Sequence, residues 1–170
     1  MTEITKTIIK FNERFADKEF CLEMVKLDSN LISRIVNPTD EMINIAIEKN
    51  EHAILYLNNI SEEICIKLVR KQPGFLRWLK KQTENTIIEA VKINGLMLMF
   101  ALFQNEKIIL TAVRNNGMAL PYAWFQTPLI CYEAIKQNRD ALKFVKLPED
   151  KEEREKFIKE LDELLKELDN

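Results

Sequence analysis

The sequence predicts an all-α protein built as a short α-solenoid of two-helix repeats. Three observations lead to this prediction. One pattern of residues returns every 22 positions, apolar side chains recur at helical spacing within each repeat, and only three glycines occur in 170 residues. So few glycines could not serve the turns of an all-β fold, whereas a period of this order is typical of stacked helical units.

The repeats follow one another without insertion or deletion. They are Asp17–Pro38, Thr39–Ile60, Ser61–Gln82, Thr83–Gln104, Asn105–Gln126 and Thr127–Pro148. The echo is clearest between AVKINGLMLMFALFQ, which begins at Ala90, and AVRNNGMALPYAWFQ, which begins at Ala112. We number these units as repeats 1 to 6 and the positions within each repeat from 1 to 22. Because neither helix of a unit can bury its apolar stripe alone, the units are expected to stack into a continuous core.

The first half of each repeat carries the signals of an α-helix. Position 1 is always a good N-cap residue: Asp17, Thr39, Ser61, Thr83, Asn105 and Thr127. Positions 2 and 3 are rich in Asp and Glu, which complement the positive end of a helix dipole. Positions 5, 8 and 9 are apolar, and this i, i+3, i+4 spacing places them on one face. An amphipathic helix is therefore predicted to begin at position 2.

The middle of each repeat is expected to be a turn. Position 12 is Asn in four repeats, and Gly95 and Gly117 follow it in two of them. Asn and Gly commonly end a helix by adopting the left-handed conformation, so we expect this conformation here. Asn-Gly between apolar runs is also a hairpin signal, but the apolar residues at positions 15, 16 and 19 recur at helical spacing. A second, shorter helix is therefore predicted after the turn.

The two ends of the chain depart from the repeat and are predicted to cap the array. Residues 1–16 place four apolar side chains on one helical face. Residues 149–170 combine an apolar stripe with a charged opposite face, which is typical of an amphipathic capping helix. A coiled-coil partner helix is the alternative for this C-terminal segment, although its apolar seam is short for a coiled coil.

The core of the repeat carries a recognisable motif, A-V-K-x-N-G-x-A-L. Its matching residues are Ala90, Val91, Lys92, Asn94, Gly95 and Leu98 in repeat 4, Ala112, Val113, Arg114, Asn116, Gly117, Ala119 and Leu120 in repeat 5, and Ala134, Ile135, Lys136, Asn138, Ala141, Leu142 and Phe144 in repeat 6. This motif resembles a family of short helical repeats, domain of unknown function 4116. Repeat 3 departs from it, because Pro73 displaces the glycine by one position. The resemblance implies a tandem helical array of a kind found in viruses, phages and microbial eukaryotes, and it implies no established activity.

The cysteine and histidine content argues against a metal or redox site. Cys21, Cys65 and Cys131 all occupy position 5, on the face predicted to be buried, and none lies in a Cys-x-x-Cys motif. His52 is the only histidine in the sequence and is expected at the surface. The sequence also lacks a phosphate-binding loop and a nucleophile elbow. We therefore expect no enzyme, no metal and no cofactor.

The sequence predicts a soluble protein with no membrane partner. The longest apolar run, Leu96–Phe103, is too short to span a bilayer, and no basic and then apolar leader precedes the repeats. Apolar residues make up 46% of the chain and the net charge is −2, which favours a globular protein over a disordered one. The expected location is the reducing cytoplasm.

Two groups of side chains are candidates for contact with a partner. In repeats 4 and 5, positions that are mostly polar elsewhere become apolar or aromatic: Met99, Leu102, Phe103, Trp124 and Phe125. Tyr122 lies between them. Repeat 3 beside them carries a basic group: Arg70, Lys71, Arg77, Lys80 and Lys81. Because aromatic residues and Met are favoured at binding hot spots, both groups are predicted to face a protein partner. The alternative is that the apolar side chains thicken the core or lie beneath the C-terminal helix.

The predicted function is a non-catalytic scaffold that binds another protein, as a monomer or a homodimer. The family resemblance adds a specific form, a phage- or virus-encoded inhibitor of a host or bacterial defence protein that acts in the host cytoplasm. A nucleic-acid-binding repeat is one alternative, because position 10 is basic in five of the six repeats. Helix-dipole compensation and i, i+3 pairs with Glu23, Glu89 and Glu133 also explain those bases, and the repeats carry nearly balanced charge. A self-assembling structural protein is the other alternative.

Overall fold

The computed structural model describes residues 14–15 and 17–166, and within each repeat it pairs an α-helix of ten residues with a 3₁₀-helix of six, labelled η. The α-helices are α2 (Lys18–Leu27), α3 (Asp40–Lys49), α4 (Glu62–Lys71), α5 (Glu84–Ile93), α6 (Glu106–Asn115) and α7 (Pro128–Gln137). The 3₁₀-helices are η1 (Ser29–Arg34), η2 (Glu51–Tyr56), η3 (Pro73–Trp78), η4 (Gly95–Phe100), η5 (Gly117–Tyr122) and η6 (Arg139–Phe144). No described residue forms a strand, so the predicted all-α helical-repeat fold is confirmed.

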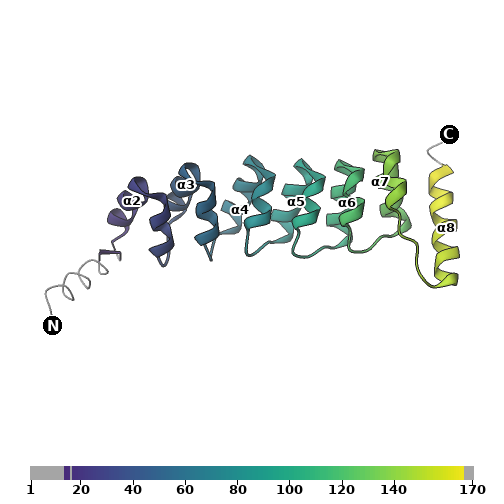
Figure 1. Ribbon diagram of the computed structural model, residues 1–170, viewed down its shortest axis with the longest axis horizontal. Helices are drawn as coiled ribbons and strands as arrows, with labels where there is room; N and C mark the ends of the chain where they lie inside the picture. Colours follow the sequence, from purple (N-terminus) through teal and green to yellow (C-terminus); the bar gives the residue numbers. More distant parts are fainter. Residues whose placement is uncertain (1–13, 16, 167–170) are drawn as a thin grey trace. The chain divides into compact units, whose positions relative to one another are not determined.

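The chain divides into two compact units, residues 1–64 and 65–170, and each is described by itself. In the first unit α2 packs against α3, and η1 packs against η2. In the second unit α5, α6 and α7 stand side by side in chain order, and η3 to η6 pack in the same order (Figure 1). Helix α8 (Lys151–Leu165) follows repeat 6 and packs against α7. The helix predicted within residues 1–16 falls almost entirely outside the described residues.

None of the described helices combines the length and the apolar character that a membrane crossing requires.

The predicted N-caps start the α-helices. In repeats 2, 4 and 6 a threonine hydroxyl accepts a hydrogen bond from the backbone N–H three residues on, as Thr39 does from Met42 at 3.3 Å. Asn105 does the same with its side-chain oxygen, 2.9 Å from the N–H nitrogen of Ile108. Each cap satisfies one of the N–H groups that a helix start leaves unpaired. The side chain at position 1 therefore fixes where each repeat begins.

The turn between the two helices differs from the prediction. We expect Asn at position 12 to be left-handed, but no described residue has a positive φ, and Asn94 is extended with φ −143°. Its N–H closes α5 by donating to the carbonyl of Ala90, and its side chain opens η4 by accepting from the N–H of Leu96 at 3.1 Å. Asn and Asp at position 12 of other repeats open the next η helix in the same way. The left-handed prediction is wrong, because position 12 is extended in every repeat, and in five of them its side chain also caps the η helix.

The η helices bury a row of residues spaced three apart. A 3₁₀-helix has three residues per turn, so positions 13, 16 and 19 lie along one line. In repeat 5 these are Gly117, Leu120 and Ala123, and all three are buried. The second helix predicted from positions 15, 16 and 19 is therefore present, but its period is 3 rather than 3.6. Positions 5, 8 and 9 of the α-helices supply the other half of the core, as predicted.

Candidate protein-binding face

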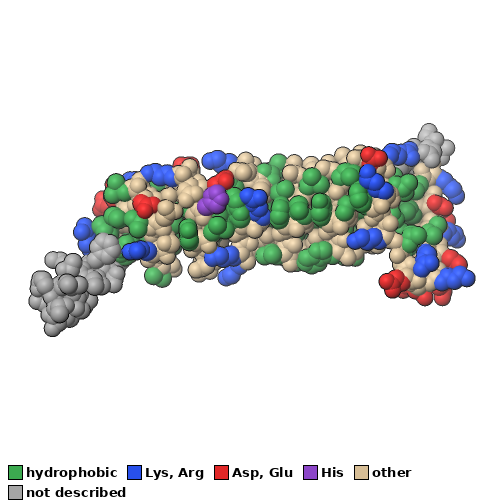
Figure 2. Space-filling model, in the orientation of Figure 1, with side chains coloured by type: hydrophobic (Ala, Val, Ile, Leu, Met, Phe, Trp, Pro, Cys, Tyr) green, Lys and Arg blue, Asp and Glu red, His purple; other side chains and the backbone are tan. Residues whose placement is uncertain are grey.

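The six apolar side chains predicted to face a partner all reach the surface. Trp124 is 64% exposed and Leu102 is 58% exposed. The other four are between 37% and 49% exposed: Met99, Phe103, Tyr122 and Phe125. We call these six side chains the apolar patch. They belong to η4, to η5 and to the loops that follow, and Figure 2 shows hydrophobic side chains gathered over the part of the array labelled α5 and α6 in Figure 1.

The alternative, in which these side chains thicken the core or lie beneath the C-terminal helix, is wrong. Helix α8 packs against α7, where its Phe157 and Leu161 are buried. Arg154 fixes the start of α8, since its Nε donates to the carbonyl of Pro148 at 2.9 Å. The apolar stripe of α8 therefore packs against α7, and the apolar patch remains exposed to solvent.

A glutamine side chain holds the loop that carries Trp124. Gln104, at position 22 of repeat 4, donates to the carbonyl of Leu98 in its own repeat at 3.3 Å. It also donates to the carbonyl of Tyr122 in repeat 5 at 3.0 Å, and its side-chain oxygen accepts from the N–H of Trp124 at 3.0 Å. One side chain therefore joins two repeats through three backbone groups. We call this arrangement the glutamine staple.

Sequence reasoning missed the glutamine staple, although it left a signal. Position 22 is Gln in three consecutive repeats, as Gln82, Gln104 and Gln126. Gln82 and Gln126 make the same three contacts one repeat earlier and one repeat later. The bonds tie down the backbone beneath the apolar patch, so its exposed side chains project from a fixed frame.

Two glycines allow one repeat to approach the next closely. A Cβ atom on Gly95 would lie 2.3 Å from the carbonyl oxygen of Ala112, and one on Gly117 would lie 2.2 Å from that of Ala134. Because neither glycine has a positive φ, what the fold requires of them is small size rather than a special backbone conformation. Gly74 of repeat 3, displaced by one position, would have no atom within 4 Å of its Cβ.

The structure separates the predicted basic group into two parts. Three members are exposed at the positions that carry the apolar patch in repeats 4 and 5: Arg77, Lys80 and Lys81. Because η3 packs against η4, these three border the patch. Arg70 and Lys71 lie instead in the last turn of α4, and Arg70 Nε pairs with the carboxylate of Glu89 at 2.7 Å. Those two residues do not share the surface of the η helices.

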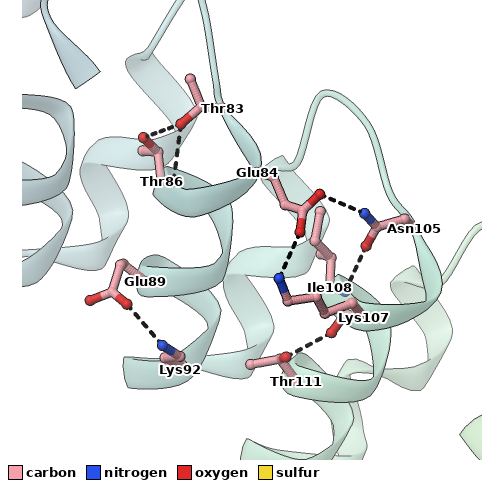
Figure 3. Close-up of polar contacts among 9 residues, drawn as sticks. All are labelled: Thr83, Glu84, Thr86, Glu89, Lys92, Asn105, Lys107, Ile108 and Thr111. Carbon is pink, nitrogen blue, oxygen red and sulfur yellow. Dashed lines mark hydrogen bonds and ion pairs between the residues drawn. The ribbon is translucent and has the colours of Figure 1, made fainter. Parts of the chain in front are cut away.

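Ion pairs engage much of the basic stripe at position 10. Arg114 of repeat 5 pairs with Glu133 of repeat 6 at 2.7 Å, and Arg70 of repeat 3 pairs with Glu89 of repeat 4 in the same register. Lys92 pairs with Glu89 within α5 at 2.9 Å (Figure 3). The predicted i, i+3 pairs are therefore present at Glu23 and Glu89, whereas Glu133 pairs with the preceding repeat.

The same hydrogen bonds lower the pKa of both carboxyl groups. Lys92 and then Arg70 hold the pKa of Glu89 below its usual value, and Arg114 does so for Glu133. A third link is shown in Figure 3, where the Glu84 carboxylate accepts from Asn105 Nδ2 at 3.0 Å and from Lys107 Nζ at 2.9 Å. The charges of the α-helices thus join neighbouring repeats to one another.

The described residues hold no cluster suited to metal or redox chemistry. All three cysteines are buried and none forms a disulfide, and burial raises the pKa of the Cys131 thiol to about 12. A thiol with so high a pKa is a poor nucleophile at neutral pH, because the thiolate is the reactive form. No group of three or more His, Cys, Asp or Glu side chains in the described part of the chain could hold a metal ion.

Comparisons with known proteins bear on the family and not on the activity. No curated protein and no solved structure matches the chain. One family model matches residues 83–123, which comprise repeat 4 and most of repeat 5. That family is described as Domain of unknown function (DUF4116), so the resemblance stated from the A-V-K-x-N-G-x-A-L motif is confirmed over this segment.

Proposed function

We propose that the protein is a non-catalytic scaffold that binds another protein through the apolar patch. The observation that carries the proposal is the exposure of six large apolar side chains on two adjacent repeats, with Trp124 and Leu102 more than half exposed. Covering apolar surface recovers about 25 cal/mol per Å², so a cluster of this kind favours association. Trp, Tyr and Met are also the residue types enriched at binding hot spots.

The frame beneath the patch supports the same proposal. The N–H groups of Leu102 and Trp124 are bonded to Gln82 and Gln104, so the loop backbone is already ordered before a partner arrives. Binding to an ordered surface loses less conformational entropy than binding to a mobile loop. The patch therefore combines apolar surface with pre-organisation.

The α-helical side supports a nucleic-acid partner less well. Arg70, Lys92 and Arg114 of the position-10 stripe are engaged with glutamates, and the whole chain has a net charge of −2. Little counterion release would accompany phosphate binding at that stripe. A phage- or virus-encoded inhibitor acting in the host cytoplasm is a specific form of the proposal that rests on the family resemblance alone.

The test begins with affinity purification from the cells that make the protein, followed by calorimetry with the purified partner. We expect Trp124→Ala to weaken binding at least tenfold, about 1.4 kcal/mol, because it removes the most exposed aromatic anchor of the patch. Its unfolding free energy should change by less than about 0.5 kcal/mol, since the side chain contributes little to the core.

Ile93→Ala is the matched control, because Ile93 is as exposed as Met99, at 49%, but lies in α5 rather than in the patch. It should bind the partner as the wild type does. Equal binding by Trp124→Ala and Ile93→Ala would show that the patch is not the interface. If the purified protein instead assembles with rising concentration, and Trp124→Ala abolishes that assembly, then self-assembly explains the patch and the proposal is wrong.

A further inference from the structure

Acidic side chains avoid one part of every repeat. No Asp or Glu occurs at positions 15 to 22 of any repeat, although acids outnumber bases in the whole chain, 27 against 25. The bases at these positions are Arg34, Arg77, Lys80, Lys81, Lys143 and Lys146. Positions 17, 18, 20 and 21 form the outer surface of the η helices and their loops, which we call the η face. The η face is therefore electropositive in a protein of negative net charge.

The bases of the second unit lie on both sides of the apolar patch. Arg77, Lys80 and Lys81 belong to repeat 3, and Lys143 and Lys146 belong to repeat 6. Because η3 packs on η4 and η5 packs on η6, the order along the η face is basic, apolar, apolar, basic. Figure 2 shows this order, with hydrophobic side chains between groups of Lys and Arg.

Two of the flanking bases, Arg77 and Lys143, lie beside aromatic rings at the surface. Arg77 lies 4.2 Å from the ring centroid of Trp78, and the Lys143 ammonium lies 5.3 Å from that of Phe144. These cation–π contacts orient the cations without neutralising them. Asp150, which follows repeat 6, caps α8 by accepting from the N–H of Glu153 at 2.9 Å. Its carboxylate therefore serves the helix start.

We propose that the η face binds a segment of another protein that is apolar in its middle and acidic at both ends. The inference rests on the proposed function and specifies the chemistry of the partner. Its bulky apolar side chains would cover the apolar patch, and its Asp or Glu residues would meet the bases of repeats 3 and 6. Charge complementarity of this kind accelerates encounter and sets the register of binding.

The spacing of the repeats sets the length of that segment. Helices pack about 10 Å apart, so three steps from repeat 3 to repeat 6 cover about 30 Å. An extended chain advances about 3.3 Å per residue, and about nine residues would span this distance. The two acidic clusters of the partner are therefore about nine residues apart when the segment is extended.

A single-stranded nucleic acid fits the η face less well. Such a ligand carries a phosphate at every nucleotide and needs Lys or Arg side chains along the whole length of its binding site. Repeats 4 and 5, which form the middle of the face, have no Lys or Arg at positions 15 to 22. Phe103, Trp124 and Phe125 carry rings on which a nucleobase could stack, but no Lys or Arg stands beside them at these positions to bind the phosphates. These observations favour a protein segment.

The experiment is selection of a phage-displayed library of random peptides, about 15 residues long, on the full chain. The peptides recovered should have an apolar centre and an excess of Asp and Glu near both ends. Reversal of three flanking charges, Lys81→Glu, Lys143→Glu and Lys146→Glu together, should weaken the selected peptides at least tenfold. The matched control reverses Lys18, Lys71 and Lys159, which are exposed lysines outside the η face, and should leave binding within about twofold.

Each outcome decides between the two proposals. Peptides that need Trp124 but show no acidic excess would overturn the partner chemistry and leave the proposed function standing. If the selection recovers the same peptides on the wild type and on Trp124→Ala, or recovers no peptide on either, both the proposed function and the partner chemistry are overturned. A labelled single-stranded oligouridylate that binds through Trp124 and the flanking lysines would overturn the inference in favour of nucleic acid.

Discussion

The joint between repeats 4 and 5 and the joint between repeats 1 and 2 are built from the same kinds of helix but with different side chains. Between repeats 4 and 5, Gly95 lies against the backbone of Ala112, and its N–H donates to Asn115 Oδ1 at 2.7 Å. Gln104 adds the three bonds of the glutamine staple. Backbone groups of the two repeats are thereby drawn together at positions 13 and 22.

The joint between repeats 1 and 2 lacks both devices. Position 13 is Ser29 and position 22 is Pro38, which has no side-chain amide. A groove of about 340 Å³ lies where the staple would be, and Pro38, Tyr56 and Asn58 are among the residues that line it. The carbonyl of Tyr56 and the N–H of Asn58 correspond in register to the groups that Gln104 binds in repeat 5.

One contact is shared by the two joints. Asn115 Nδ2 donates to the carbonyl of Lys92 at 2.8 Å, and Lys49 Nζ, from the same position 11, bonds to the carbonyl of Lys26. The α-helices are thus linked in both joints by a side chain at position 11. The α-helices therefore set the stacking, whereas positions 13 and 22 decide how closely the η helices of neighbouring repeats pack.

We call the joint between repeats 4 and 5 the tight joint and the joint between repeats 1 and 2 the loose joint. Substitution of Gly95 in the tight joint should lower the stability of the protein most. Gly95→Ala places a methyl group 2.3 Å from the carbonyl oxygen of Ala112, so the backbone of one repeat must move. We expect the unfolding free energy, measured by urea denaturation, to fall by about 3 kcal/mol. Gly74→Ala is the matched control, since its methyl group meets no atom within 4 Å, and it should be neutral or stabilising by up to about 1 kcal/mol. Similar losses in both variants would contradict the close-approach argument.

Removal of the staple should cost somewhat less. Gln104→Leu keeps a side chain of similar size but leaves the carbonyls of Leu98 and Tyr122 and the N–H of Trp124 without this partner. At about 0.5 to 1.5 kcal/mol for each bond, and with partial access to water, the expected loss is about 2 kcal/mol in urea denaturation. Gln72→Leu makes the same change at a glutamine that gives η3 no side-chain cap, and it should cost less than about 0.5 kcal/mol.

In the loose joint a glutamine can be introduced at position 22 rather than removed. Pro38→Gln puts the staple residue into repeat 1, where the corresponding backbone groups line the groove. Pro38→Ala is the reference, because both variants lose the restraint that proline places on the unfolded chain. We expect Pro38→Gln to be about 1 kcal/mol more stable than Pro38→Ala by thermal denaturation. Equal stability would mean that position 22 alone does not close the joint.

The sequence pattern predicts much of this fold because N-cap residues and apolar positions that are weak evidence in one unit recur at the same places in six repeats. Each α-helix begins at position 2, after position 1, and positions 5, 8 and 9 are buried except for the half-buried Met24 of repeat 1. The pattern misses the 3₁₀ form of the second helix and the extended backbone at position 12 that precedes it in every repeat, whether the residue is Asn, Asp or Gln. It misses the staple because two of the three groups that Gln104 binds, the carbonyl of Tyr122 and the N–H of Trp124, belong to the neighbouring repeat.

The candidate site is predictable in its composition and not in its exposure. All residues of the apolar patch except Tyr122 stand out by comparison between repeats, but whether α8 covers them depends on where the apolar stripe of α8 packs. Likewise, Arg70 belongs to a basic cluster in the sequence, yet it lies in α4, away from the η face, and pairs with Glu89 of the next repeat. Tertiary packing decides both points.

The smallest expected effect concerns the ion pair between Arg114 and Glu133, which crosses a tight joint, whereas Lys26 of the loose joint pairs within its own helix, with Glu23. Arg114 lowers the pKa of Glu133, so this carboxyl group binds its proton more weakly in the folded protein than in the unfolded chain. Its contribution is therefore complete above the unfolded pKa of about 4.5 and is lost as pH falls through the lower, folded value.

Arg114→Gln should lower the unfolding free energy at pH 7 by less than about 1 kcal/mol, because the arginine side chain is largely exposed. Urea denaturation from pH 7 down to pH 3 should show the wild type and the variant converging as Glu133 becomes protonated. Lys26→Gln should differ from the wild type by less in unfolding free energy, since its ion pair with Glu23 lies within one helix and no contact between repeats is lost. If the unfolding free energies of the wild type and Arg114→Gln still differ at low pH, Arg114 stabilises the joint through packing of its aliphatic stem rather than through its charge.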